Sequence, residues 1–150
     1  MAAYKTVVVG TDGSDSSFIA VDRAARLAAD TGATLVIASA YQPSNDRNLA
    51  ELQDRLGDDV AYQVVGSAPA EEAVREAAER ARSQGAAAVE TVVVDGDPVA
   101  TLSTVARERS ADLLVVGNRG LNTLAGRILG SVPSEVARKS TVDVLIVHTT

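Results

Sequence analysis

The chain of 150 residues lacks several residue types, and each absence excludes a class of site. It contains no cysteine and no tryptophan, and its only histidine is His148. Without cysteine there is no disulfide framework, thiolate metal site or cysteine nucleophile. One histidine cannot form a multi-histidine metal site, and a Ser-His-Asp arrangement would depend on His148 alone. We interpret His148 as a residue of a terminal strand and expect neither catalytic nor metal-binding residues.

An excess of positive charge and long apolar runs are also missing. The formal net charge is −6, which disfavours a broad electrostatic interaction with nucleic acid or with anionic lipid. Residues 1–5 lead directly into an apolar run that is too short for a signal peptide or a membrane span. We therefore expect a cytoplasmic protein that binds neither nucleic acid nor membrane.

What the sequence does contain is an alternation of short β-branched runs with amphipathic segments, which is typical of a parallel α/β sheet. Most of the runs are apolar at consecutive positions, so we expect helices on both faces of the sheet. A chain of this length predicts a single domain spanning 1–150. The predicted strands are residues 5–10, 34–40, 90–95, 112–117 and 143–148.

Four amphipathic segments are predicted helices with recognisable ends. The first follows Ser14 and stops near Gly32, and it carries Asp22 and Arg26 four residues apart, a spacing that favours an ion pair. The second covers about 67–85, the third begins at Pro98 behind Asp97, and the fourth covers about 131–139.

The stretch 41–66 is too long for a bare connection in a compact domain. Leu49, Leu52 and Leu56 have helical spacing, while acidic residues between them favour a solvated outer face. We predict a flexible flap with a short helix inside it.

The candidate site follows from where ligands bind in such sheets, which is at the carboxyl ends of the strands where the winding reverses. If the first three strands wind one way and the last two the other, loops 10–14 and 117–130 face one crevice. The glycines of the second loop allow close approach of backbone N–H groups to an anion, and the helix that begins at Ser131 adds partial positive charge. Asp12 can accept a hydrogen bond from a ribose hydroxyl.

Each of these residues also has a purely structural interpretation. Glycines after strands are usually turn residues, Asp12 and Ser131 can cap helices, and Arg119 and Arg127 can be solvated surface charges. The placement of all of them on one predicted edge favours a nucleotide site.

At these residues the chain resembles a known family. The spacing Gly117-x-x-Gly120, nine residues, then Gly130-Ser131 resembles the nucleotide-binding signature of the ATP-binding branch of the universal stress protein family. Residues 7–14, 96–98 and 142–147 extend the resemblance over nearly the whole chain. It implies a doubly wound, Rossmann-like or flavodoxin-like sheet with strand order 3-2-1-4-5. It also implies a homodimer along the last strand, 143–148, which would cover an apolar edge.

The resemblance also implies roles for individual residues. The base and ribose would lie against Gly10, Asp12, Ala40 and Val116. The phosphates would lie at Gly117, Arg119, Gly120, Gly130, Ser131 and Val132, with Arg127 as a second nearby cation.

Two adenine nucleotides compete as the ligand. ATP carries about four negative charges and would need Mg²⁺ beside Arg119 and Arg127. Cyclic AMP carries a single phosphate charge and demands less of the site. The sequence resembles actinobacterial relatives that bind cyclic AMP, and both ligands stay open.

Three classes of function remain. We favour a nucleotide-binding sensor or regulator of the stress response. A slow ATPase or another nucleotide-dependent enzyme is the second class, although no P-loop lysine and no evident general base are present, so we expect no enzyme. The third class is a structural or partner-binding dimer without ligand, which the intact glycine signature disfavours.

Overall fold

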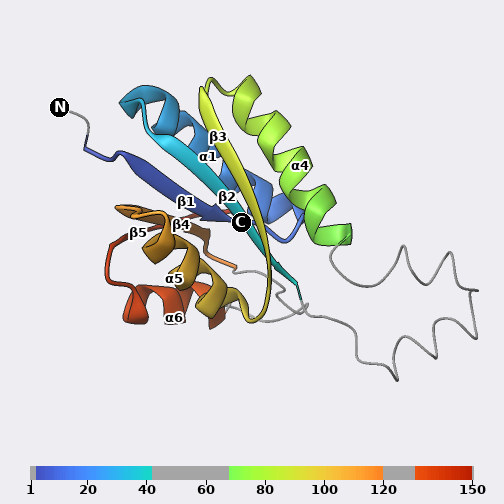
Figure 1. The fold of residues 1–150 in the computed structure, drawn as a ribbon, viewed down its shortest axis with the longest axis vertical. Coiled ribbons are helices and arrows are strands. Elements are labelled where there is room, and N and C mark those ends of the chain that lie inside the picture. The colour runs from blue at the N-terminus through green and yellow to red at the C-terminus, as the bar shows by residue number, and fades with distance from the viewer. Residues whose placement is uncertain (1–2, 42–67, 120–130, 150) are drawn as a thin grey trace, which may run out of the picture.

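A computed structural model describes residues 3–41, 68–119 and 131–149 of the chain (Figure 1). Five parallel strands form one sheet in the order β3-β2-β1-β4-β5, which confirms the predicted fold class and strand order. The strands are β1 (Thr6–Gly10), β2 (Thr34–Tyr41), β3 (Ala88–Asp95), β4 (Leu113–Gly117) and β5 (Asp143–Val147). The helices are α1 (Asp15–Thr31), α4 (Ala68–Ser83), α5 (Pro98–Glu108) and α6 (Ser131–Lys139).

The predicted two-sided burial of the sheet is confirmed. Helices α1 and α4 cover one face, and α5 and α6 cover the other (Figure 1). Successive residues of a strand point to opposite faces, so each strand contributes side chains to two separate hydrophobic cores. Val7 and Val9 pack in the core beneath α1 and α4, whereas Val8 packs in the core beneath α5 and α6, and all three are fully buried.

The helix ends follow local signals that the sequence already displays. Ser14 caps α1 by accepting a hydrogen bond from Ser17 N at 3.2 Å, and Asp97 caps α5 by accepting one from Ala100 N at 3.0 Å. Gly32 ends α1 in the left-handed conformation with φ of 75°. Strand β3 begins two residues before its predicted start because its pairing with β2 already starts at Ala88.

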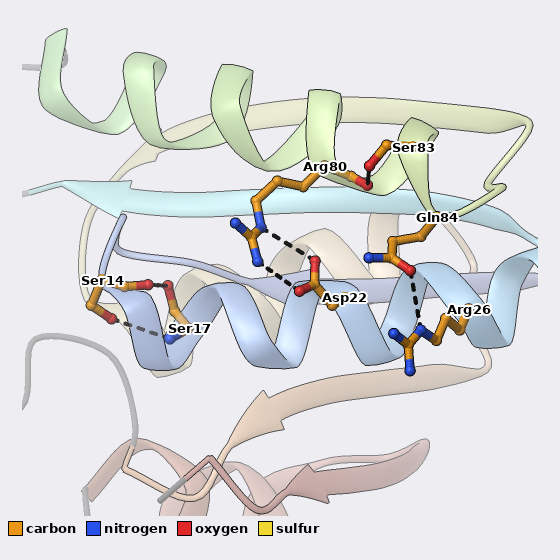
Figure 2. Close-up of polar contacts among 7 residues, drawn as sticks. All are labelled: Ser14, Ser17, Asp22, Arg26, Arg80, Ser83 and Gln84. Carbon is orange, nitrogen blue, oxygen red and sulfur yellow. Dashed lines mark hydrogen bonds and ion pairs between the residues drawn. The ribbon is translucent and has the colours of Figure 1, made fainter.

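The predicted ion pair between Asp22 and Arg26 is wrong. Asp22 accepts hydrogen bonds from Arg80 of α4, at 3.2 Å from Nε and 2.6 Å from Nη2. Arg26 Nε donates to Gln84 Oε1 at 3.1 Å (Figure 2). Because α4 packs beside α1, Asp22 and Arg26 each bond to a side chain from the other segment, and they do not pair with one another.

Some predictions fall outside the described residues. The predicted flap and its short helix lie in the undescribed range 42–67, and Tyr41 is the last residue of β2. The single-domain assignment of residues 1–150 stays a prediction. Within the described ranges, no helix is both long and apolar enough to cross a membrane.

Candidate functional site

The candidate site lies where the winding of the sheet reverses. From β1 the chain continues to β2 and β3 on one side, while β4 and β5 lie on the other. Strands β1 and β4 are adjacent and parallel, with Val9 paired to Val115. Their carboxyl ends therefore share one edge of the sheet, as predicted, and the loops that follow Gly10 and Gly117 start from that edge.

The loop after β1 holds Asp12 in a defined turn. Thr11 N continues the strand pairing by donating to Ala38 O at 3.0 Å, and Asp12 Oδ1 then accepts a hydrogen bond from Ser14 N at 3.0 Å. A carboxylate that bonds the backbone two residues ahead forms an Asx turn. Asp12 is half-buried and does not cap α1, because Ser14 occupies the cap position.

A chain of hydroxyl groups stabilises this turn from below. Thr11 Oγ1 accepts a hydrogen bond from Gly13 N at 3.1 Å and lies 2.7 Å from Ser17 Oγ. Ser17 donates its only hydroxyl proton to Ser14 O at 2.9 Å, so Thr11 must be the donor to Ser17. Thr11 and Ser17 are both buried. This pair was not predicted, and the only signal for it in the sequence is the group of small hydroxyl residues on both sides of Gly13.

The end of β4 contributes backbone, because its side chains are already packed. Val116 is 1% exposed and lies in the core shared with Val132 of α6. Neither side chain can reach a ligand without leaving that core. The predicted roles of Val116 and Val132 are therefore confined to their backbone groups.

The space that a side chain at Gly117 would fill is already occupied by its neighbours. A Cβ atom at this position would lie 3.1 Å from Thr149 Cγ2 and 3.9 Å from Ala20 Cβ. The glycine thus leaves room for the residues that follow β5, in addition to any ligand that approaches its amide group.

Asn118 links the end of β4 to the end of β5. Its backbone N donates to Val147 O at 2.9 Å. Its side-chain Oδ1 accepts hydrogen bonds from Thr149 N at 2.9 Å and from Thr149 Oγ1 at 2.8 Å. The sequence carried no signal for these bonds, since asparagine between glycines is also an ordinary turn residue.

The remaining predicted residues are distributed as follows. Ala40 is half-buried near the end of β2 and pairs with Val94, and Arg119 is exposed in the turn after β4. Helix α6 begins at Ser131, as predicted. Gly120, Arg127 and Gly130 lie outside the described residues. In the parts of the chain that the structure describes, no three His, Cys, Asp or Glu residues are placed to hold a metal ion.

A doubly wound sheet whose β1 and β4 end side by side at the reversal of strand order has the architecture of an α/β nucleotide-binding protein. The sequence model of the universal stress protein family matches residues 3–148, and the chain belongs to this family.

Individual relatives match the chain over its full length. Universal stress protein Rv1636 of Mycobacterium tuberculosis strain H37Rv is 57% identical over 150 residues, which is 100% of each chain. Universal stress protein YxiE of Bacillus subtilis strain 168 is 31% identical and covers 97% of this chain and 99% of its own. Among solved structures, a universal stress protein in complex with cAMP is 50% identical, with a TM-score of 0.75 over 99% of this chain and 100% of that one.

Proposed function

We propose that this chain binds an adenine nucleotide at the carboxyl edge of β1 and β4 and acts as a nucleotide-binding regulator of the stress response in the cytoplasm. The observation that carries the proposal is that β1, which leads into the Asp12 turn, and β4, which ends at Gly117, are adjacent and parallel at the reversal of strand order. The similarity to the universal stress protein bound to cAMP supports it.

Within this site, Asp12 is the group for the ribose. A carboxylate can accept about four hydrogen bonds, so the bond from Ser14 N leaves acceptor capacity for a sugar hydroxyl. The Asx turn and the Thr11–Ser17 pair hold the carboxylate in place before the ligand arrives, which lowers the entropic cost of binding. Gly10 and Ala40 border the space for the base.

The phosphate would be held by backbone N–H groups and few cations. Gly117, the start of α6 at Ser131 and the undescribed residues Gly120 and Gly130 supply the amide groups. Arg119 and Arg127 are the only basic residues between Arg109 and Arg138. Such a site suits a ligand with one phosphate charge, so we infer that cyclic AMP is bound in preference to ATP.

ATP is the second candidate and would require Mg²⁺. Asp12 is the only carboxylate among the proposed ligand-binding residues, so the phosphate oxygens themselves would supply most of the ion's ligands. The ion would neutralise phosphate charge that Arg119 and Arg127 cannot balance alone.

We propose binding without catalysis. The proposed residues comprise backbone amides, one hydroxyl, one carboxylate and two arginines, and none of them is a histidine, the side chain that most often acts as a general base. Release of phosphate from ATP at rates of about 1 s⁻¹ or more would show instead that the site is an enzyme.

We further propose that two copies associate through their last strands, residues 143–148. Strand β5 is at the edge of the sheet, and its Ile146 is 43% exposed. An unpaired strand edge with an exposed apolar side chain is stabilised by pairing with another chain. A second copy satisfies this edge symmetrically.

Calorimetric titration tests the proposed function directly. Purified protein is titrated with cyclic AMP, AMP, ATP alone and ATP with Mg²⁺. We expect cyclic AMP to bind most tightly, and Mg²⁺ to strengthen the binding of ATP. Failure of all four nucleotides to bind below millimolar concentration would falsify the proposal and favour a ligand-free dimer.

A further inference from the structure

The end of β5 and the residues after it are joined to the start of the β4–α6 connection by three hydrogen bonds. Asn118 N donates to Val147 O, and Asn118 Oδ1 accepts from both the N–H and the hydroxyl of Thr149. The partners lie 31 residues apart in the sequence for the Thr149 bonds. Asn118 and Thr149 are both half-buried, so these bonds are partly shielded from water.

The same two segments also pack against each other. Thr149 Cγ2 occupies the space beside Gly117 that a side chain at this position would fill. Gly117 and Asn118 are therefore held from two directions, by the packing of the threonine methyl group and by its two hydrogen bonds. The turn that leaves β4 begins from this held pair.

Two bonds to one oxygen atom fix the direction of the Asn118 carboxamide. Thr149 approaches Oδ1 with its backbone N–H at 2.9 Å and its hydroxyl at 2.8 Å. With the main-chain bond to Val147 added, the peptide planes around Asn118 have little freedom to rotate. Backbone amides bind an anion well only when their direction is set in advance.

We propose that Asn118 is a positioning residue of the nucleotide site, which sets the direction of the Gly117 amide group by anchoring Gly117–Asn118 to Thr149. This inference rests on the proposed nucleotide-binding function and assigns to Asn118 no contact with the ligand. Strand β5, the proposed dimer edge, is thus followed within two residues by Thr149, which holds Asn118 in place.

The coupling between the Asn118–Thr149 bonds and nucleotide binding is reciprocal. If the Asn118–Thr149 bonds favour nucleotide binding, then bound nucleotide favours these bonds by the same free energy. The Thr149 N–H should therefore exchange with solvent more slowly when the nucleotide site is filled. A residue that only stabilised the fold would not produce this selective response.

The experiment compares two substitutions in the full chain, with cyclic AMP and ATP plus Mg²⁺ as probes. Asn118→Ala removes the acceptor of both bonds, and we expect about tenfold weaker binding of both probes. Thr149→Val keeps the backbone bond and removes only the hydroxyl bond, so we expect a two- to fivefold loss. Gln84→Ala and Thr91→Val are the matched controls, because they make similar chemical changes directly after α4 and at an exposed position of β3, and they should bind as the wild type does.

Amide hydrogen exchange measured by NMR provides the second readout. Saturation of the wild type with cyclic AMP should slow exchange at Thr149, and Asn118→Ala should speed it in the free protein. Asn118→Asp retains an oxygen acceptor and should restore the protection of Thr149. Unchanged affinity in both Asn118→Ala and Thr149→Val overturns the positioning role while leaving the proposed function intact. Absence of nucleotide binding by the wild type itself overturns both.

Discussion

Asp22 on α1 and Arg80 on α4 form a paired contact, with the Arg80 guanidinium donating to both carboxylate oxygens at 3.2 Å and 2.6 Å (Figure 2). The same guanidinium lies 5.1 Å from the ring centroid of Phe18, the only phenylalanine of the chain. The hydrogen bond to Asp22 raises the pKa of Arg80 above its ordinary value. This contact holds α4 against the helix that begins behind the Asp12 loop.

Replacement of Arg80 by lysine is therefore expected to destabilise the protein. Lysine keeps the charge but loses the two-pronged hydrogen bond and the planar contact with Phe18, at a cost of about 1 kcal/mol in the free energy of unfolding. Urea denaturation measures this cost. Arg75→Lys is the control, because Arg75 pairs with Glu72 and Glu79 on the exposed side of the same helix, and it should destabilise the protein less than Arg80→Lys does. Equal effects of the two substitutions would contradict the special role of Arg80.

Acid should weaken the fold through Asp112. Its carboxylate accepts hydrogen bonds from Lys5 N at 2.9 and 3.2 Å and from Thr6 N at 3.1 Å, joining the start of β1 to the start of β4. Burial raises the pKa of Asp112. The backbone hydrogen bonds together lower it by more than burial raises it, so the pKa in the folded protein lies below its ordinary value. A depressed pKa in the folded state means that this stabilisation is present above the unfolded pKa of about 3.9 and is lost as the pH falls through the folded value.

Asp112→Asn tests this dependence. The amide oxygen keeps an acceptor but loses the charge, so we expect a loss of about 1 kcal/mol at pH 7. The difference in unfolding free energy between wild type and variant should shrink as the pH falls below about 4, where the Asp112 carboxylate becomes protonated first in the unfolded state and then, at lower pH, in the folded state. A difference that stays constant from pH 7 to pH 2 would mean that the Asp112 charge does not contribute.

Asp12 offers the most direct test of the ribose contact. Asp12→Asn keeps an acceptor for Ser14 N but weakens a bond to a sugar hydroxyl, whereas Asp12→Ala removes both. We expect Asp12→Ala to cost roughly 1 to 3 kcal/mol in the binding of cyclic AMP. Titration with the 2′-deoxy analogue is the control. Once Asp12 is alanine, removal of the 2′-hydroxyl should cost little more, and fully additive losses would place Asp12 away from the ribose.

Gly117→Ala separates two reasons for a glycine at this position. The added Cβ meets Thr149 Cγ2 at 3.1 Å, so Thr149 must shift by a few tenths of an ångström. The same Cβ can also hinder the approach of the phosphate. We expect weaker nucleotide binding, measured by calorimetry. The double variant Gly117→Ala/Thr149→Ser removes the methyl group in conflict and keeps the hydroxyl that donates to Asn118. Recovery of affinity in the double variant would identify packing against Thr149 as the cause, and continued weak binding would identify obstruction of the phosphate.

The proposed dimer can be tested with two similar surface substitutions. Ile146 on β5 and Ile19 on α1 are 43% and 41% exposed, respectively. Ile146→Lys places a charge on the proposed strand-to-strand interface, and sedimentation velocity should show monomers at concentrations at which the wild type is dimeric. Ile19→Lys should leave the dimer unchanged. If only Ile19→Lys dissociated the dimer, the interface would lie on α1 and not on β5.

The strands and helix ends could be predicted because their causes are local. Val7, Val8 and Val9 are apolar in succession, which indicates burial on both faces, and Ser14 and Asp97 cap helices through bonds to residues three positions ahead. The carboxyl-edge site also followed, once the order of the strands placed β1 beside β4.

The failures share a different physical cause. Asp22 and Arg26 had the right spacing for an ion pair, but the packing of α4 on α1 supplied each with a partner from a distant part of the chain. The anchor between Asn118 and Thr149 likewise depends on β5 lying beside β4.

The sequence by itself therefore determined the doubly wound architecture and the edge of the sheet at which the candidate site is proposed, because periodic burial and capping operate within a few residues. Only the tertiary structure decided which polar side chains pair, which of the predicted ligand-binding residues have their side chains buried in the core, and that Gly117 packs against Thr149. Those outcomes depend on competition among partners that lie far apart in the sequence, and the competition is resolved only when the elements pack.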